Sequence, residues 1–292
     1  MSDEGSELRR GGRPDRSWVS RLSADEQKAL KDSETFFQRP SGRVQKALGK
    51  LGRPLDYLLK ASPQKFQSGV TSAIHGVLTT VAEGAEAGSS EAGLVDELCS
   101  ELGWDLDPWE RIYSSDYRIL EQAAQRRVTV AKRFATVQGG VTGITGAPGL
   151  IADVPSLYFL LFRMVHQVAV CLGFPAHSPA EKRYLLQVMN VGHHLELRDR
   201  RCALLELEQM ESELELKSES TEDLQRTLLA KSVQLLARKL ASTLVQRKAA
   251  QSVAFVGGAV GAVINRQLTE DVGLTALHAY RRRFLKKSAE FR

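Results

Sequence analysis

Apolar residues recur every three or four positions along much of this 292-residue chain. The clearest run lies on one face of a helix between residues 66 and 81: Phe66, Val70, Ala73, Ile74, Val77, Leu78 and Val81. This period predicts an amphipathic helix that ends near Gly84. Strand signals are weak, because β-branched runs are short and no Asn-Gly or Asp-Gly turn joins two alternating segments. The pattern therefore predicts an all-α protein, folded as a multi-helix bundle.

Several short motifs mark the starts of helices. Residues 23–26, Ser-Ala-Asp-Glu, have the spacing of a capping box. Ser62-Pro63, Asp107-Pro108 and Ser178-Pro179 each place a capping side chain before a proline that fits the first helical turn. Residues 1–16 mix Gly, Pro, Ser and charge with little to bury, which is typical of a disordered tail. Residues 17–60 are predicted to form an N-terminal helical extension.

Two segments are nearly free of charge. Residues 134–162 carry one charged side chain, Asp153, and residues 253–264 carry none. A membrane-spanning helix needs about 20 predominantly apolar residues. The second segment is too short, and Pro148, Asp153 and Pro155 interrupt the first, so neither is expected to span a membrane.

Glycines four residues apart occur in both segments, at Gly139 and Gly143 and at Gly257 and Gly261. This spacing leaves bare backbone on one helix face, where a neighbouring helix or an acyl chain can approach closely. We expect the two segments to pack against each other, so that glycine-rich, closely packed helices form the centre of the bundle. Insertion of the same faces into a membrane is the alternative.

The net charge of +5 is unevenly distributed. Twelve Lys and Arg residues lie between Arg9 and Arg53, and a second basic cluster lies near the last residues. Because basic surfaces attract anionic lipid, we expect that cluster to contact lipid: Arg281, Arg282, Arg283, Lys286 and Lys287. Ordinary solvated helix faces are the alternative. No recognised nucleic-acid-binding module accompanies the cluster, so a specific nucleic-acid partner is not expected.

The cysteines indicate a reducing compartment. Cys99, Cys171 and Cys202 are odd in number and contain no CxxC pair, so neither a disulfide framework nor a zinc site is predicted. The first residues carry charge without the apolar run of a signal peptide. These observations predict a cytoplasmic protein.

Potential metal ligands gather at one place only, where His193 and His194 are followed by Glu196 and Asp199. Adjacent histidines on a helix point about 100° apart and cannot both face one ion. No metal or other cofactor is therefore predicted, and an exposed helix end is expected at Gly192.

Catalytic signals are weak as well. His166 and Cys171 have apolar neighbours, which favours a core histidine and an unreactive thiol. There is no GxSxG elbow and no phosphate-binding loop. Asp153 is the strongest candidate for a functional residue, because a carboxylate in an apolar run must be solvated, capped or functional. The sequence Asp-Val-Pro favours a helix start that this carboxylate caps, and a role as ligand or base is the alternative.

Several motifs together resemble the EcsC family of bacterial proteins. They are residues 146–155 (GAPGLIADVP), 178–189 (SPAEKRYLLQVM) and 257–265 (GGAVGAVIN), followed by Asp271-Val272. The resemblance covers roughly residues 60–288, which implies one helical domain at 61–290, and the acidic stretch 196–222 looks like a variable insertion in it. It adds Asn265 and Asp271 to Asp153 as candidate binding residues. Some relatives carry a peptidase label, which nothing in these residues supports.

Three functions from different classes follow from these patterns. A peripheral membrane or membrane-complex accessory protein is favoured, resting on an anionic membrane surface or an integral partner at the inner face of the cell membrane. A peptidase-like hydrolase is an alternative that rests on the relatives alone. A soluble scaffold or regulator is the third. The patterns do not identify an enzyme, and they favour a protein without catalytic activity.

Overall fold

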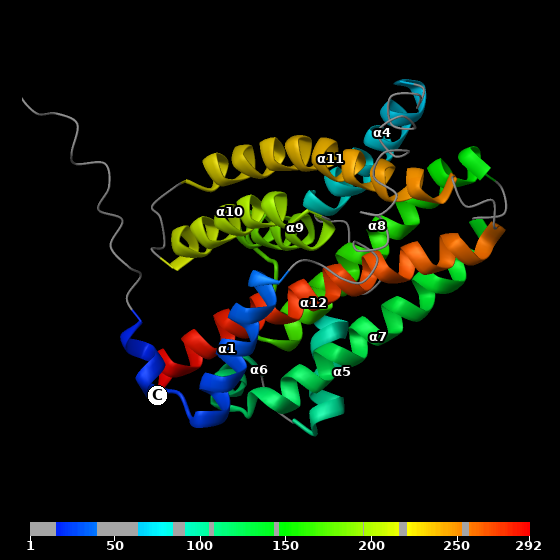
Figure 1. Ribbon diagram of the computed structural model, residues 1–292. Coiled ribbons are helices and arrows are strands. Elements are labelled where there is room, and N and C mark those ends of the chain that lie inside the picture. Colours follow the sequence, from blue (N-terminus) through cyan, green and yellow to red (C-terminus); the bar gives the residue numbers. More distant parts are fainter. Residues whose placement is uncertain are drawn as a thin grey trace, which may run out of the picture.

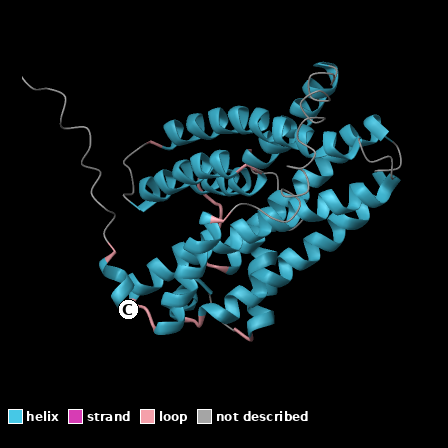
Figure 2. Cartoon of the chain, in the orientation of Figure 1, coloured by secondary structure: helices cyan, strands magenta, loops and turns pink. Residues whose placement is uncertain are grey.

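The computed structural model describes residues 16–39, 64–83, 91–104, 108–142, 146–194, 196–215, 221–252 and 257–292. Within these ranges the regular structure is helical and contains no strand (Figure 2). The prediction of an all-α multi-helix bundle is therefore confirmed. In chain order the elements are η2 (Ser17–Arg21), α1 (Ala24–Gln38), α4 (Gln64–Ala82), α5 (Glu91–Leu102), α6 (Pro108–Arg111), η3 (Ile112–Ser114), α7 (Tyr117–Thr142), α8 (Gly146–Cys171), α9 (Pro179–His193), α10 (Leu197–Glu215), α11 (Glu222–Ser252) and α12 (Gly257–Phe291).

Helix starts follow the local capping chemistry. Ser23 Oγ accepts a hydrogen bond from the Glu26 backbone N–H, and the Glu26 carboxylate accepts one from the Ser23 N–H, which completes the predicted capping box. At α9, Ser178 Oγ accepts the Glu181 N–H at 3.1 Å, and Pro179 is the first helical residue. These bonds satisfy backbone N–H groups that a helix leaves unpaired at its start.

The long helix α12 is the centre of the bundle. It packs most extensively on α7, and also on α9, α8 and α1, while α11 covers α4 and α9 (Figure 1). Side chains from several helices meet in one core where solvent does not reach, as shown by Leu120, Leu157, Tyr184, Leu268 and Phe284, each 0% exposed. Five residues of the apolar face predicted for 66–81 are buried as part of α4: Val70, Ile74, Val77, Leu78 and Val81.

Helix α8 is the most apolar element. Among the described helices, Asp153–Cys171 is a stretch long and apolar enough to cross a membrane by length and composition, with a mean hydropathy of 1.4. Of that stretch, 61% is buried inside the bundle. Helices α7, α4, α12 and α9 surround it. A mostly apolar and largely buried helix is typical of the interior of a multi-helix bundle.

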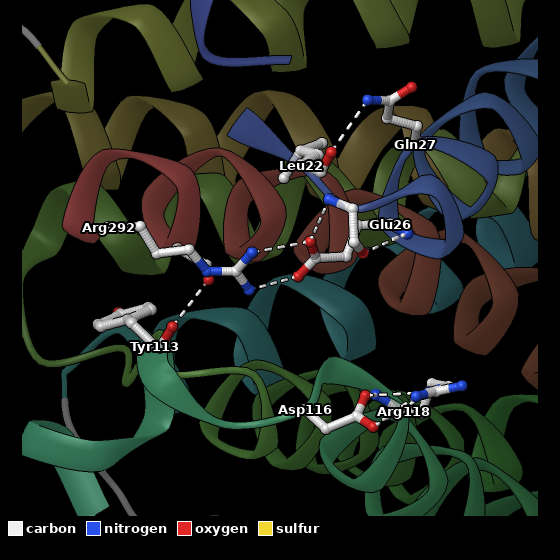
Figure 3. A network of polar contacts seen from close by, with 9 residues as sticks. Leu22, Glu26, Gln27, Tyr113, Asp116, Arg118 and Arg292 are labelled. Atoms are coloured by element: carbon white, nitrogen blue, oxygen red, sulfur yellow. Dashed lines mark hydrogen bonds and ion pairs between the residues drawn. The ribbon is translucent and has the colours of Figure 1, made fainter. Parts of the chain in front are cut away.

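The first described helix is tied to the last residues of the chain. Arg21 Nη1 donates to the Ala289 carbonyl. Arg292 donates two hydrogen bonds to the Glu26 carboxylate at 2.7 and 3.0 Å, as Figure 3 shows. Ser288 Oγ donates to the Tyr113 carbonyl at 2.7 Å. The predicted extension 17–60 thus contains two elements, η2 and α1, that pack on α12; its residues 40–60 lie outside the described ranges, as does the predicted tail up to residue 15.

The acidic stretch 196–222 forms helix α10 over most of its length. This helix packs on α9 and on α1. Its carboxylates pair with basic groups of three other helices: Glu206 with Lys239, Glu208 with Arg282, and Glu213 with Arg183. Helix α10 is therefore an integrated layer of the bundle.

Candidate functional site

The last turns of α7 and the first turns of α8 and α12 lie together at one end of the molecule, on the right in Figure 1. We call this region the α7/α12 end. Here a Cβ atom added to Gly139 would lie 2.5 Å from the Gly261 carbonyl oxygen, so the two backbones are in direct contact. Gly143 lies outside the described residues, and Gly257 is the first residue of α12 in a turn whose surroundings are not described.

A buried polar cluster lies beside this crossing. The Asp153 carboxylate, 2% exposed, accepts hydrogen bonds from Gln138 Nε2 at 2.7 Å and from Asn265 Nδ2 at 2.9 Å. Thr269 Oγ1 in turn donates to the Asn265 carbonyl at 2.8 Å. The cluster joins α8 to α7 and α12. Because an unpaired buried carboxylate is costly, these amide donors stabilise the packing of the three helices.

The prediction that Asp153 caps the start of a helix is wrong. Helix α8 begins at Gly146, and Pro155 lies inside it, so Asp153 is about two turns from the helix start. The carboxylate instead accepts hydrogen bonds from side-chain amides of the neighbouring helices α7 and α12. Of the two other candidate residues, Asn265 joins Asp153 directly, whereas Asp271 is six residues further along α12 and accepts a hydrogen bond from Gln267.

The C-terminal end of α9 is buried, which corrects the expectation of an exposed helix end. A Cβ atom on Gly192 would lie 2.6 Å from the Val272 Cα atom. His193 is 1% exposed, and its Nε2 lies 2.8 Å from the Tyr158 hydroxyl. Glu196 is exposed, and within the described residues no group of three His, Cys, Asp or Glu is placed to hold a metal ion.

The predicted lipid-contacting cluster is largely internal. Arg281 is 9% exposed and pairs with Glu121, and Arg283 is 9% exposed and forms two hydrogen bonds to Glu181 at 2.7 and 2.8 Å. The structure therefore corrects the expectation for Arg281 and Arg283, since a guanidinium paired inside the bundle is not available to a lipid phosphate. Arg282 is half-buried and pairs with Glu208.

The two lysines of the cluster are more accessible. Lys286 is half-buried and Lys287 is exposed. Lys287 Nζ lies 4.5 Å from the centre of the Tyr113 ring, a cation–π distance. Contact of these two lysines with lipid remains a prediction.

An exposed apolar stripe runs along α7 toward the α7/α12 end. Its members follow one another at spacings of four, three and four residues: Val130 (47% exposed), Phe134 (64%), Val137 (69%) and Val141 (66%). Val263, 57% exposed, lies near the start of α12 at the same end. Single exposed apolar residues are common, but a continuous stripe marks an interaction surface.

A serine and a histidine contact each other at Ser33 and His278, 3.1 Å apart. Ser33 is fully buried and donates its hydroxyl proton to the Ala29 carbonyl, while Arg281 donates to its oxygen. Burial, with Arg281 and Arg200 nearby, lowers the pKa of His278 to about 3. Such a histidine is a weak base, and the hydroxyl is not poised as a nucleophile.

The remaining catalytic candidates have similarly buried surroundings. Burial raises the pKa of the Cys171 thiol to about 12, so the reactive thiolate is suppressed. Burial, with His177 and Lys182 nearby, lowers the pKa of His166 to about 4.

Sequence reasoning missed several residues of the α7/α12 end. Gln138 is a polar residue in a small-residue run and gave no signal. The stripe from Val130 to Val141 has helical spacing, which alone does not distinguish a buried face from an exposed one. Outside this end, in the middle of α12, Gly273 was missed too: a Cβ there would lie 2.5 Å from a Val128 methyl group, and Gly273 has no GxxxG partner in the sequence.

Comparisons with known proteins agree with the resemblance of the motifs. The model of the EcsC protein family matches residues 21–285, a range that includes α1. The chain is 22% identical over 236 residues to a protein of Bacillus subtilis (strain 168) described as uncharacterized protein YdbA, covering 80% of this chain and 84% of that protein. No solved structure matches the chain.

Proposed function

The chain belongs to the EcsC protein family, and on that premise we propose that it is a peripheral membrane protein whose α7/α12 end rests on an anionic bilayer. The exposed stripe of α7 is the observation that carries the proposal. Four side chains between Val130 and Val141 would enter the interface between headgroups and acyl chains. They extend over roughly 16 Å of helix, at 1.5 Å per residue.

The distribution of charge supports an anionic partner. Residues 122–152 and 224–269 contain no Asp or Glu, yet they hold eleven Lys and Arg residues. These ranges include the end of α7, the first turns of α8 and α12 and most of α11. Arg133 and Arg266 are exposed next to Phe134 and close to Val263. Several of these cations pair with carboxylates from outside the two ranges, such as Lys132 with Glu270. Exposed arginines beside exposed apolar side chains fit a bilayer that contains anionic lipid.

The expected free energy of binding corresponds to a reversible attachment. Full burial of one Val or Phe side chain contributes about 1.5–3 kcal/mol. Each Arg near an anionic surface adds about 1 kcal/mol. A few partly buried side chains and two arginines therefore suffice for a weak, salt-sensitive attachment. We place this attachment at the inner face of the cell membrane, where anionic lipids give a negative surface potential.

Vesicle co-sedimentation tests the proposal. The wild-type chain should pellet with vesicles containing anionic phosphatidylglycerol and not with neutral phosphatidylcholine, and added salt should release it. The double variant Phe134→Ser/Val137→Ser should bind at least about ten-fold more weakly, because two anchoring side chains are lost. Ile119→Ser is the matched control: Ile119 is 50% exposed on the same helix but at its other end, and this variant should bind as wild type does.

Arg133→Gln/Arg266→Gln should reduce both the affinity and its dependence on salt. Equal binding to neutral and anionic vesicles would contradict the proposal, as would an unaltered Phe134→Ser/Val137→Ser variant. If the wild-type chain attaches to membranes in cells but binds no vesicles, its partner is an integral membrane protein and not the bilayer itself.

A further inference from the structure

A cavity of ≈ 590 Å³ lies between α4, the start of α9 and the first turns of α11. This volume is in the range of small-molecule pockets. Its walls combine apolar groups, such as Ala82, Leu229 and Val233, with the basic side chains of Lys182 and Arg226. The three helices come from distant parts of the chain, so the cavity is a product of the tertiary fold.

Lys182 is the basic group set deepest in this cavity. It is half-buried, and its Nζ donates a hydrogen bond to the carbonyl of Ala82, the last residue of α4, at 3.1 Å. An ammonium group has three N–H donors. This bond stabilises the C-terminal end of α4 and leaves donors for a further acceptor. Within the described residues, no carboxylate forms an ion pair with Lys182.

A second cation, Arg226, lies near Lys182. Burial lowers its pKa, and the nearby Arg226 lowers it further. Burial, reinforced by His177 and Lys182, likewise lowers the pKa of His166 on α8. Arg226 is itself paired with Glu222 at 2.7 Å, one helical turn away on the exposed face of α11. Of these two basic side chains, Lys182 is therefore the one without an ion pair in the described residues, and a negative group beside it would be stabilised.

We propose that this cavity binds a small amphiphilic anion, an apolar body that carries one phosphate or carboxylate group. The anionic group accepts hydrogen bonds from Lys182 and lies near Pro179, where the N-terminal end of the α9 dipole adds positive charge. The apolar body packs on Leu229 and Val233. Glu83 and Glu222 also line the cavity, so repulsion disfavours ligands with several anionic groups.

This site is separate from the proposed membrane surface. Along α11, residue 229 precedes the end of the helix at residue 252 by roughly 35 Å, at 1.5 Å per residue. Binding of a water-soluble anion needs no vesicle, so it can be measured independently of membrane attachment.

Isothermal titration calorimetry on the full chain tests the site with hexyl phosphate, inorganic phosphate and hexylammonium as probes. One hexyl phosphate should bind per chain. Inorganic phosphate should bind at least about ten-fold more weakly, because it lacks the apolar body, and hexylammonium should not bind. Vesicles containing phosphatidic acid then distinguish the sources: displacement of hexyl phosphate indicates a lipid headgroup, and lack of displacement indicates a free metabolite.

Two variants remove the site in different ways. Lys182→Gln should weaken hexyl phosphate binding by about ten-fold through loss of a charged donor. Ala230→Trp places a large ring on the exposed wall of the cavity and should abolish binding while the melting temperature stays near that of wild type. Lys231→Gln, an exposed position of α11 outside the lining, is the control and should bind normally. Equal affinity for hexyl phosphate and hexylammonium, unaltered affinity in both variants, or no binding of hexyl phosphate would overturn the proposal.

Discussion

At its N-terminal end α12 contacts α7 through glycine backbone and α8 through a side-chain amide, whereas toward its C-terminal end it is held by arginine–carboxylate pairs. Gly261 and Asn265 make the first kind of contact, and Arg281 and Arg283 make the second. One helix therefore uses close backbone approach and amide hydrogen bonds at one end and arginine–carboxylate pairs at the other.

The difference explains which surface remains available to a partner. Basic side chains near the C-terminal end are used inside the bundle, because α7 and α9 supply Glu121 and Glu181 to meet them. At the α7/α12 end there are almost no acidic groups, so Arg133 and Arg266 stay at the surface. A high density of basic residues in the sequence is thus a poor guide to a basic surface. Whether such residues stay exposed depends on whether other helices supply acidic partners.

The largest effect is expected from breaking the charged end. Glu121→Ala leaves Arg281 buried without its carboxylate, which typically costs about 3–5 kcal/mol in unfolding free energy. The surface pair of Glu97 and Arg127 is the comparison, because Glu97 is 58% exposed; Glu97→Ala should cost less than about 1 kcal/mol. Urea unfolding of both variants measures the difference, and equal losses would show that burial of the pair is unimportant.

Overpacking the glycine contact should have the next largest effect. In Gly139→Ala, a methyl group meets the Gly261 backbone, which cannot move as a side chain can, and we expect a loss of about 1–3 kcal/mol. Gly76→Ala is the matched control in helix α4, where a Cβ atom meets nothing within 4 Å. There the better helix propensity of alanine should stabilise the protein by roughly 0.5–1 kcal/mol. Thermal melting should therefore shift in opposite directions.

The polar cluster beside the glycine contact should show an effect of similar size that is coupled between two residues. Asp153→Asn replaces one acceptor oxygen by an NH₂ group, which faces the amide donor of Gln138 or Asn265 and costs about 1–3 kcal/mol. In a double-mutant cycle with Asn265→Ala, the two changes should lose less together than the sum of their separate losses. Strict additivity would mean that Asp153 and Asn265 stabilise the bundle independently.

The smallest effect is expected in the pH dependence of stability, and it concerns Glu26. Burial alone would raise the pKa of Glu26, but hydrogen bonds from Arg292 and Ser23 outweigh it and hold the pKa below its usual 4.5. A carboxylate with a lowered pKa stabilises the folded state above its unfolded pKa. This contribution should be lost as pH falls from about 4.5 through the folded-state value. Unfolding free energies between pH 7 and pH 3 should fall less steeply in Arg292→Gln, and an identical slope in both proteins would contradict this assignment.

Local chemistry made part of the fold predictable. Ser23 with Glu26 and Ser178 with Pro179 specify helix starts through residues a few positions apart, and the period of α4 specifies its buried face. Such signals depend on neighbours in the sequence, so they survive without knowledge of the tertiary structure.

The environment of single polar residues was much less predictable. His193 follows a glycine at a helix end and resembles an exposed residue, yet Tyr158 from α8 contacts it in the core. Asp153 resembles a cap in its sequence, but Gln138 and Asn265 reach it from helices that lie 15 residues before and 112 residues after it in the chain. Partners at such separations are set by helix packing, which no local pattern records.

The central position of α12 also constrains the order in which the molecule can assemble during synthesis. Helices α7, α8 and α9 are translated before α12, which fills the space between them. A further 266 residues are translated after Glu26 before its partner Arg292 is present. A ribosome stalled before codon 257 would hold helices whose apolar faces lack their common partner, and such a nascent chain becomes a substrate for chaperones and proteases.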